Sequence, residues 1–217
     1  MKNKPEQYVP ALGYAPLTRF YDLVVGLTTR EAIFKNALLD QAPLSNESRV
    51  LDVACGTGTL VLMIKSRFPL AEVTGIDGDP TILELARRKI EKAAVSIQLD
   101  CGLSYEMPYD ENQFDVVVSS LFFHHLDYAA KERTAREIYR VLHPQGEVHI
   151  VDWGKPDNSL MALLFYGVQL LDGFENTNDN RKGQIPTILA GAGFREVATS
   201  QSFSTIFGTL ALYRGQK

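Results

Sequence analysis

The sequence predicts an α/β fold, a doubly wound and mostly parallel seven-stranded sheet that ends in an antiparallel hairpin. Two observations predict it. Between about residues 49 and 152, short apolar runs rich in β-branched residues alternate with segments of helical period. Such alternation is typical of right-handed crossovers and of a parallel sheet with helices on both faces. The last two extended runs, at about 194–203 and 205–214, have no helical segment between them, so we expect them to pair antiparallel.

Composition and charge are those of an ordinary globular chain. The 217 residues suffice for one α/β domain, 45% of them are hydrophobic, and the net charge is −4. A slightly acidic chain argues against a nucleic-acid partner, which requires clustered Lys and Arg. Cys55 and Cys101 do not make a disulfide framework, and the sequence shows neither a signal-like apolar start nor a transmembrane run. We therefore expect a cytoplasmic protein with no integral membrane segment.

The segment before the first strand is expected to be helical. Apolar residues recur at helical spacing between Leu17 and Asp40. A break near Gly26 divides the segment into two helices, and Thr28 or Thr29 fits the cap of the second. Polar residues around Ser45–Ser48 then lead into the first strand.

Each later element has a recognisable boundary. Asp79 and Pro80 suit the cap and first turn of a helix, and Val116–Val118 indicate a strand buried on both faces. A turn at His143–Gly146 precedes the last parallel strand. The expected strands are 49–53, 71–76, 95–99, 114–119 and 147–152, and the expected helices among them are 58–67, one starting at 80, and 129–142.

The last third of the chain changes character. Leu160–Leu171 is a strongly apolar helix, the polar run 172–180 follows it, and another helix is expected at about 183–192. The apolar helix is too short to span a membrane. It is expected either to pack on the sheet or to wall an apolar pocket.

A glycine turn after the first strand is the clearest local signal. Gly56 and Gly58 follow the apolar strand end around Asp52, and a helix opens at Thr59. Strand, glycine turn and helix together let the backbone approach a ligand and offer it N–H groups. A dinucleotide-binding turn would carry a third glycine where Val61 stands, which disfavours a nucleotide-dependent oxidoreductase.

Acids and small residues also mark the ends of the other predicted strands. Asp77 ends the second strand, about 20 residues beyond the glycine turn, where a carboxylate can accept hydrogen bonds from ribose hydroxyls. Asp100 ends the third strand, and Ser119 ends the fourth. A single acid at a strand end is more often a cap or turn former. Because these strand ends meet at one edge of a doubly wound sheet, the set together fits an adenosine ligand.

These residues resemble the motifs of class I S-adenosylmethionine-dependent methyltransferases. The resemblance covers roughly 48–155 and includes the strand Phe114–Ser119 followed by Leu126, and the turn Leu142–Glu147. Tyr21-Asp22 and His124-His125 resemble especially the ubiquinone/menaquinone-biosynthesis type. Gly78 departs from the pattern, as does Cys101-Gly102, and both departures would loosen the adenine pocket.

The resemblance implies S-adenosyl-L-methionine as the cofactor and S-adenosyl-L-homocysteine as the product. It implies that the glycine turn lies along the methionine part, that Asp52 positions the amino-acid end, and that Asp77 holds the ribose. It also implies that Asp100 and Cys101 border the adenine and that the Ser119 carbonyl receives the ammonium group. The implied cofactor-binding residues are Tyr21, Asp52, Ala54, Cys55, Gly56, Gly58, Asp77, Gly78, Asp100, Cys101 and Ser119. Tyr21 is equally consistent with packing inside its helix.

Methyl transfer from a sulfonium mainly requires alignment of the acceptor. A general base is needed only where the acceptor loses a proton. His124 and His125 follow the fourth strand and are the candidates, with packing under or capping of the next helix as the alternative. We expect no metal site, since the histidines are not grouped with cysteines; magnesium held by Asp152 and Asp172 is a minor alternative.

The expected organisation is a single domain over 1–217. It comprises an N-terminal helical lid (1–47), a cofactor-binding core (48–155), and acceptor-side helices with the final hairpin (156–217). The expected activity is methyl transfer to a small, apolar or aromatic acceptor by a monomer or homodimer. A non-catalytic protein that binds the cofactor on the same fold is the remaining alternative.

Overall fold

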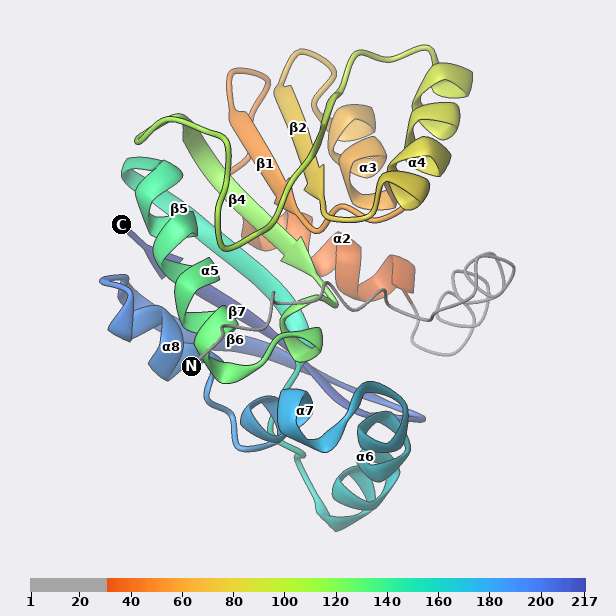
Figure 1. Ribbon diagram of the computed structural model, residues 1–217, viewed down its shortest axis with the longest axis vertical. Coiled ribbons are helices and arrows are strands. Elements are labelled where there is room, and N and C mark those ends of the chain that lie inside the picture. Colours follow the sequence, from red (N-terminus) through yellow and green to blue (C-terminus); the bar gives the residue numbers. More distant parts are fainter. Residues whose placement is uncertain (1–30) are drawn as a thin grey trace, which may run out of the picture.

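A computed structural model describes residues 31–217 of the chain (Figure 1). The first N-terminal helix, the caps at Thr28 or Thr29, and Tyr21 lie outside the described residues. The second expected helix is α2, Glu31–Gln41. Among residues 31–217, none of the helices combines the length and the apolar character that crossing a membrane requires.

Strands and helices alternate through the core as the sequence predicts. The strands are β1 (Arg49–Val53), β2 (Glu72–Asp77), β3 (Gln98–Cys101), β4 (Phe114–Ser120), β5 (Leu142–Trp153), β6 (Arg195–Thr205) and β7 (Gly208–Gln216). The helices after α2 are α3 (Thr59–Arg67), α4 (Pro80–Ala93), the 3₁₀ turn η1 (Phe123–His125), α5 (Tyr128–Val141), α6 (Ser159–Asp172), α7 (Phe174–Arg181) and α8 (Ile185–Gly191).

The seven strands form one sheet in the order β3-β2-β1-β4-β5-β7-β6. The neighbours from β3 to β5 are parallel, whereas β7 pairs antiparallel with both β5 and β6. The order reverses at β1, since the chain builds outward first through β2 and β3 and then through β4 and β5. The predicted fold class, including the C-terminal antiparallel hairpin, is therefore confirmed.

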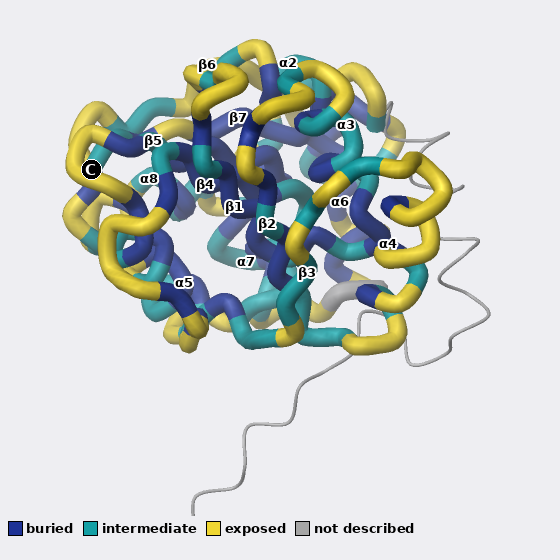
Figure 2. Tube along the Cα trace, turned by 90° about the horizontal axis from the view of Figure 1, so that it is seen from above, coloured by how far each residue is buried: buried dark blue, intermediate teal, exposed yellow. Residues whose placement is uncertain are grey.

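Helices cover both faces of the sheet, and each face has its own apolar core. One core joins α2, α3, α4 and the inner side of α6 to the sheet, and the other joins α5, α8 and η1 to the opposite face. The central strands run through the buried interior while the outer sides of the helices are exposed (Figure 2). Val117 and Val118 of β4 point to opposite faces and are both fully buried, as the β-branched run predicts.

Three boundaries differ from the sequence-based expectation. β3 pairs with β2 only over Gln98–Cys101 rather than 95–99, because Val95 and Ile97 pack against the core ahead of the ladder. The expected turn at 143–146 lies inside β5. The pairing of β4 with β5 is irregular there, because Phe114 pairs with Leu142 whereas Val116 pairs with Glu147. The polar run after α6 forms α7, whose Thr177 and Asn180 are fully buried.

The cap of α4 gives a first testable prediction. The Asp79 side chain accepts hydrogen bonds from the backbone N–H groups of Thr81 and Ile82. Asp79→Ala should lower the free energy of unfolding by about 1 kcal/mol, because both donors lose their acceptor. Denaturant unfolding measures this change. Glu84→Ala, on the exposed side of the same helix, serves as the control and should change stability by less than about 0.5 kcal/mol; equal effects would contradict the cap.

Candidate functional site

The carboxyl ends of the parallel strands are level with one another. The register aligns Val53 at the end of β1 with Ile76 of β2 on one side and with Ser119 of β4 on the other. Ile76 is in turn level with Asp100. Residues far apart in the sequence therefore meet along one edge of the sheet, beside the point where the strand order reverses, which is where ligands bind in such sheets.

The glycine turn has the left-handed backbone that its sequence predicts. Ala54, Gly56 and Gly58 have φ angles of 60°, 55° and 78°, and the Gly58 N–H closes the turn on the Cys55 carbonyl at 3.0 Å. A Cβ added to Gly58 would lie 3.1 Å from the Ala86 Cβ, so this glycine allows close packing of α4. A Cβ added to Gly56 would meet nothing within 4 Å. The turn is thus tight on its inner side and open at Gly56.

Asp77 is tied to the glycine turn. Its Oδ2 accepts a hydrogen bond from the Gly56 N–H at 2.9 Å, and its Oδ1 accepts one from the Asp79 N–H at 2.9 Å. Burial raises the pKa of this carboxyl, while the N–H groups of Asp79 and Gly56 oppose the rise. A carboxylate has about four acceptor positions, so the N–H groups of Gly56 and Asp79 do not fill it. Gly78, which follows, is half-buried.

Asp100 lies on the neighbouring strand and has partners that sequence reasoning missed. Its Oδ2 accepts hydrogen bonds from the Tyr109 hydroxyl at 3.0 Å and from the Gln98 amide at 2.8 Å. Cys101 is level with Asp77 and is exposed, whereas Cys55 in the glycine turn is buried. Tyr109 comes from the long loop between β3 and β4, for which the sequence offers no periodic pattern.

Asp52 is buried in β1 with 1% of its surface exposed. Neither carboxylate oxygen has a hydrogen-bond partner among the described residues. Burial raises the pKa of this carboxyl to about 8, against the opposing charge of Lys35. A buried carboxyl without a partner is costly, so a cationic or hydrogen-bonding ligand group at this strand would relieve it.

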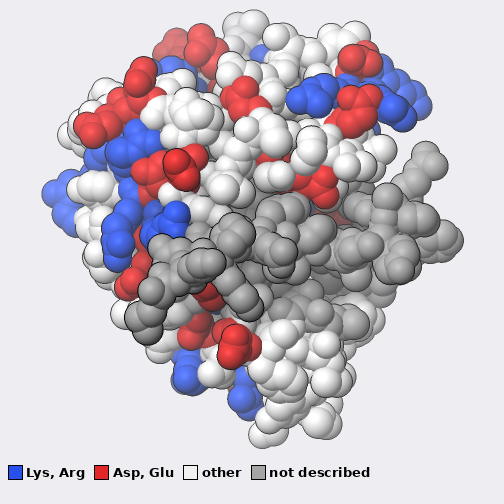
Figure 3. Space-filling model, viewed as in Figure 1, with Lys and Arg blue, Asp and Glu red and all other residues white. Residues whose placement is uncertain are grey.

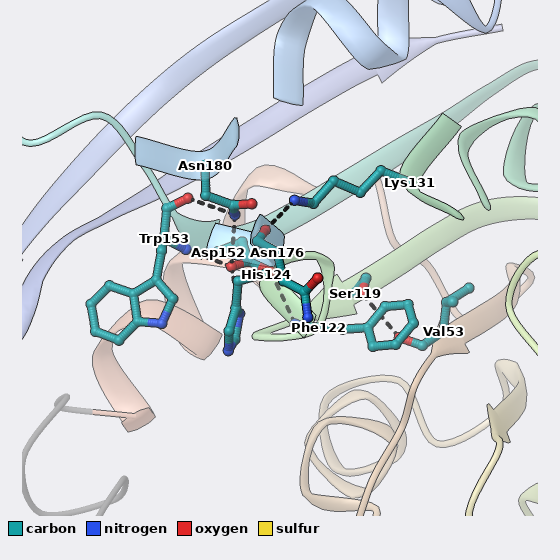
Figure 4. Close-up of polar contacts among 9 residues, drawn as sticks. All are labelled: Val53, Ser119, Phe122, His124, Lys131, Asp152, Trp153, Asn176 and Asn180. Carbon is teal, nitrogen blue, oxygen red and sulfur yellow. Dashed lines mark hydrogen bonds and ion pairs between the residues drawn. The ribbon is translucent and has the colours of Figure 1, made fainter. Parts of the chain in front are cut away.

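Ser119 belongs to β4, which pairs with β1 on the side opposite to β2. Its side chain is fully buried, and its Oγ donates a hydrogen bond to the Val53 carbonyl at 2.9 Å. This bond fixes the tip of β4 to the tip of β1 (Figure 4). The serine side chain therefore positions the strand end at which the ligand is expected.

His124 and His125 have different surroundings although they are neighbours in η1. His124 is 1% exposed, and its Nδ1 lies 2.8 Å from Asp152 Oδ1. The centroids of the two imidazole rings are 4.0 Å apart, and the ring planes are tilted by 41°. Burial, with the charge of His124, lowers the pKa of His125 to about 3. Figure 4 shows the hydrogen bond between His124 and Asp152.

Asp152 is the centre of a buried polar network. Besides His124, it accepts hydrogen bonds from the backbone N–H groups of Phe122 and Trp153 and from the Asn180 amide, at 2.9, 2.6 and 3.2 Å. Burial alone would raise the pKa of Asp152, but the charge and hydrogen bond of His124 and the Trp153 N–H hold it below its usual value. The network thus contains a carboxylate. In the sequence, this network is indicated only by an Asp near the end of an apolar strand.

Lys131 of α5 belongs to the same region. Its side chain is fully buried, donates a hydrogen bond to the Asn176 carbonyl, and lies 3.5 Å from Asp179 Oδ2. Asn176 and Asp179 both belong to α7. Two buried contacts, one through Lys131 and one through Asn180, therefore attach α7 to the core next to His124 (Figure 4).

Metal ligation has little support among the residues that the structure describes. No cluster of three or more His, Cys, Asp or Glu side chains there has the arrangement of a metal site. The oxygens of Asp152, one of the two residues considered for magnesium, already accept hydrogen bonds from four protein groups.

The face of the molecule in Figure 3 carries positive and negative side chains mixed together. On the face in Figure 3, Lys and Arg are interspersed with Asp and Glu, and the region around α6 is mostly uncharged. Met161, Phe165 and Val168 are the buried side of α6, whereas Leu163 and Leu170 on its other side are 64% and 75% exposed. The helix therefore packs on the sheet with one face and presents apolar side chains with the other.

Comparison with known proteins agrees with this geometry. Residues 50–146 match the family model described as "Methyltransferase domain". This segment is a methyltransferase domain. It holds β1 to β4, the glycine turn, Asp77, Asp100, Ser119 and the histidine pair. The recognition of the family from the glycine turn and the strand-end residues is thereby confirmed.

Individual relatives extend the comparison beyond the methyltransferase domain. A demethylmenaquinone methyltransferase of Thermus thermophilus is 35% identical over 127 residues, which are 58% of this chain and 55% of that protein. The chain therefore spans about half the length of this curated relative. A solved SAM-dependent methyltransferase of Aquifex aeolicus aligns over 97% of this chain and 99% of its own, with a TM-score of 0.69 at 17% identity.

A second solved structure carries a ligand. Phospholethanolamine N-methyltransferase 2 of Haemonchus contortus, in complex with phosphomonomethylethanolamine and S-adenosylhomocysteine, has a TM-score of 0.67 at 19% identity. The alignment covers 84% of this chain and 52% of that chain. At such identities the two solved structures show a shared fold.

Proposed function

We propose that the protein is an S-adenosylmethionine-dependent methyltransferase that acts on a small, apolar or aromatic acceptor. The observation that carries the proposal is the meeting of the open glycine turn with Asp77, which accepts a hydrogen bond from Gly56, at one edge of the sheet. Bound S-adenosylmethionine would supply a methyl group activated on sulfonium. The chain's own residues then bind the cofactor and align the acceptor, which accounts for most of what this reaction requires.

In this proposal, the residues at the end of each strand bind a different part of the cofactor. The glycine turn and Asp52 take the methionine part, Asp77 takes the ribose hydroxyls, and Asp100 with Cys101 borders the adenine. Support comes from the order of the tips, since Asp52, Asp77 and Asp100 lie on adjacent strands β1, β2 and β3. Residues 48–155 would be the cofactor-binding core and 156–217 the acceptor side, with 1–47 as a lid. The part assigned to Tyr21 lies outside the described residues.

The acceptor class is proposed from the surroundings of α6 and from the relatives. Helix α6 presents the exposed apolar residues Leu163 and Leu170, and its Phe165 ring lies 5.7 Å from the ring of Trp153 at the end of β5. The named activity of the Thermus thermophilus relative is methylation of demethylmenaquinone. We therefore propose an aromatic acceptor of quinol type. Demethylmenaquinol, incubated with methyl-labelled S-adenosylmethionine, is the probe; transfer only to water-soluble amines would overturn this acceptor class.

Asp77→Ala should weaken the binding of S-adenosylmethionine by about tenfold or more, because a charged hydrogen-bond acceptor for the ribose is lost. The same change frees the Gly56 N–H in the turn. Isothermal titration calorimetry measures the dissociation constant of the full chain and of the variant. Asp110→Ala, an exposed acid on the loop before β4, is the matched control.

The same titration tests the proposed function as a whole. Binding of S-adenosylmethionine and S-adenosylhomocysteine by the wild-type chain supports it, whereas binding of NAD alone would replace it with an oxidoreductase. Binding without label transfer to demethylmenaquinol or to any compound of a metabolite extract would favour the non-catalytic alternative. Unchanged affinity in Asp77→Ala would show that the ribose lies elsewhere.

A further inference from the structure

We infer that Tyr109 is a positioning residue that acts through Asp100 and makes the cofactor site selective for the 6-amino group of adenine. Glu137 and Arg140 of α5 in turn position the loop that carries Tyr109. This inference rests on the proposed function, in which Asp100 borders the adenine. Neither Tyr109 nor the two residues of α5 belong to the cofactor-binding set that the sequence predicts.

Asp100 is held through one of its two carboxylate oxygens. The Tyr109 hydroxyl and the Gln98 amide both donate to Oδ2, at 3.0 and 2.8 Å, and neither of these donors binds Oδ1. Asp100 is half-buried, so a ligand can reach it. Because Oδ2 is held by two donors, the carboxylate has a set orientation, and Oδ1 is the oxygen that these donors leave to a ligand.

A carboxylate in this place distinguishes hydrogen-bond donors from acceptors. An ionised carboxylate can only accept. The 6-amino group of adenine donates, whereas a 6-keto oxygen, as in hypoxanthine, would bring two acceptors together. Sites that hydrogen-bond an N–H group reject an analogue that lacks it, because a polar group of the site is then left without a partner. An adenosyl compound should therefore bind more tightly than the corresponding inosyl compound.

The Tyr109 hydroxyl is suited to remain a donor. Burial, together with the charge of Asp100, raises the pKa of this phenol, so the hydroxyl keeps its proton. Only 9% of the surface of Tyr109 is exposed, and its ring meets the Phe114 ring of β4 edge-on, with centroids 5.1 Å apart. Packing of the ring therefore fixes the hydroxyl beside Asp100.

Two charged side chains of α5 hold the backbone on both sides of Pro108. Glu137 Oε2 accepts a hydrogen bond from the Met107 N–H at 2.8 Å. Arg140 donates to the carbonyls of Met107 and Tyr109, at 3.2 and 2.7 Å. The two side chains also pair with each other, since Arg140 Nε lies 2.7 Å from Glu137 Oε1. The position of Tyr109 thus depends on α5.

The pair on α5 stays ionised, and a further contact supports it. The hydrogen bond from Arg140 lowers the pKa of the Glu137 carboxyl, and the same bond raises the pKa of Arg140. Charge-assisted hydrogen bonds of this kind are stronger than neutral ones. The hydroxyls of Ser104 and Thr134, 2.9 Å apart and buried, join the same loop to the same helix.

The first test compares two ligands that differ at one position of the base. Isothermal titration calorimetry of the full chain measures the dissociation constants of S-adenosylhomocysteine and of S-inosylhomocysteine, which has a 6-keto oxygen in place of the amino group. The wild-type chain should bind the adenosyl compound at least about tenfold more tightly. In Tyr109→Phe this ratio should fall by at least about threefold, because Asp100 loses a donor that orients it. Tyr105→Phe, which removes a hydroxyl from the same loop, should keep the wild-type ratio.

The second test addresses α5. Arg140→Met removes the donors to the Met107 and Tyr109 carbonyls, so the ratio should fall as it does in Tyr109→Phe. Arg136→Met, one turn earlier and with its side chain 60% exposed, is the matched control. Because Arg140 acts through Tyr109, the double variant should have the ratio of Tyr109→Phe alone, whereas independent effects would multiply. Arg140→Lys keeps the charge without the planar fork and takes the place of Arg140→Met if that variant does not fold.

The outcomes separate this inference from the proposed function. Tight binding of S-adenosylhomocysteine with an unchanged ratio in Tyr109→Phe, or a wild-type ratio near one, would overturn the inference and leave the proposed function in place. A purely structural role of Arg140 would lower the melting temperature of its variants but leave their ratio at the wild-type value. Failure of the wild-type chain to bind either compound would remove the proposed function, and the inference with it.

Discussion

Replacing Asp52 with asparagine should make the stability of the chain much less dependent on pH. The pKa of the buried Asp52 carboxyl is about 8, against about 3.9 in an unfolded chain. Between these values the folded state binds a proton that the unfolded state has lost, so the free energy of unfolding falls as pH rises from about 4 to about 8. This one group contributes a slope of up to about 1.4 kcal/mol per pH unit.

The expected result is that Asp52→Asn gains stability relative to wild type as pH increases, by several kcal/mol at about pH 8. Denaturant unfolding of both proteins at about pH 5, 6.5 and 8 measures this difference, and subtraction removes the contributions of other titrating groups. Asp110→Asn, at an exposed position, should show no such trend. A variant that is less stable than wild type at about pH 8 would show that Asp52 is ionised and paired in the fold.

Replacing Lys131 with alanine should destabilise the fold strongly, because this side chain attaches α5 to α7. The substitution removes a fully buried stem and the donor to the Asn176 carbonyl, and it leaves Asp179 without its ion-pair partner. Removing one member of a buried pair costs about 3–5 kcal/mol. We expect a loss near the lower end of this range, because Asp179 is 17% exposed and water can solvate it.

Lys131→Met is the matched control, because it keeps an apolar stem of similar length while it removes the charge and the hydrogen-bond donor. It should cost less than Lys131→Ala. Thermal unfolding gives the stability of both variants, and hydrogen exchange at residues 174–181 reports whether α7 opens locally. If both variants retain wild-type protection in α7, the contacts of Lys131 do not hold that helix.

The core of the fold is predictable because its signals are local. Gly56 and Gly58 need left-handed backbone, and Asp79 caps its own helix. Once strands alternate with helices, the rules for crossovers place Asp77, Asp100 and Ser119 at one edge. These residues could be brought together from the sequence because each stands at the end of an element.

The rest depends on contacts between distant segments. Asp152, Lys131 and Asn180 come from β5, α5 and α7, and no spacing in the sequence links them. Helix α7 itself has a polar sequence that indicates a loop, and it is ordered by burial of Thr177 and Asn180 against the core. A pattern of hydrophobic residues cannot reveal a helix whose buried positions are polar.

The place of β7 also bears on how the protein is made. This strand, Gly208–Gln216, lies between β5 and β6, and most of its residues are buried. During translation, β5 and β6 therefore both lack the strand that pairs with them, until β7 has left the ribosome. Until then the apolar edge of β5 is exposed to solvent or to other chains, and a nascent chain that stalls before residue 208 would carry an unpaired strand prone to aggregation.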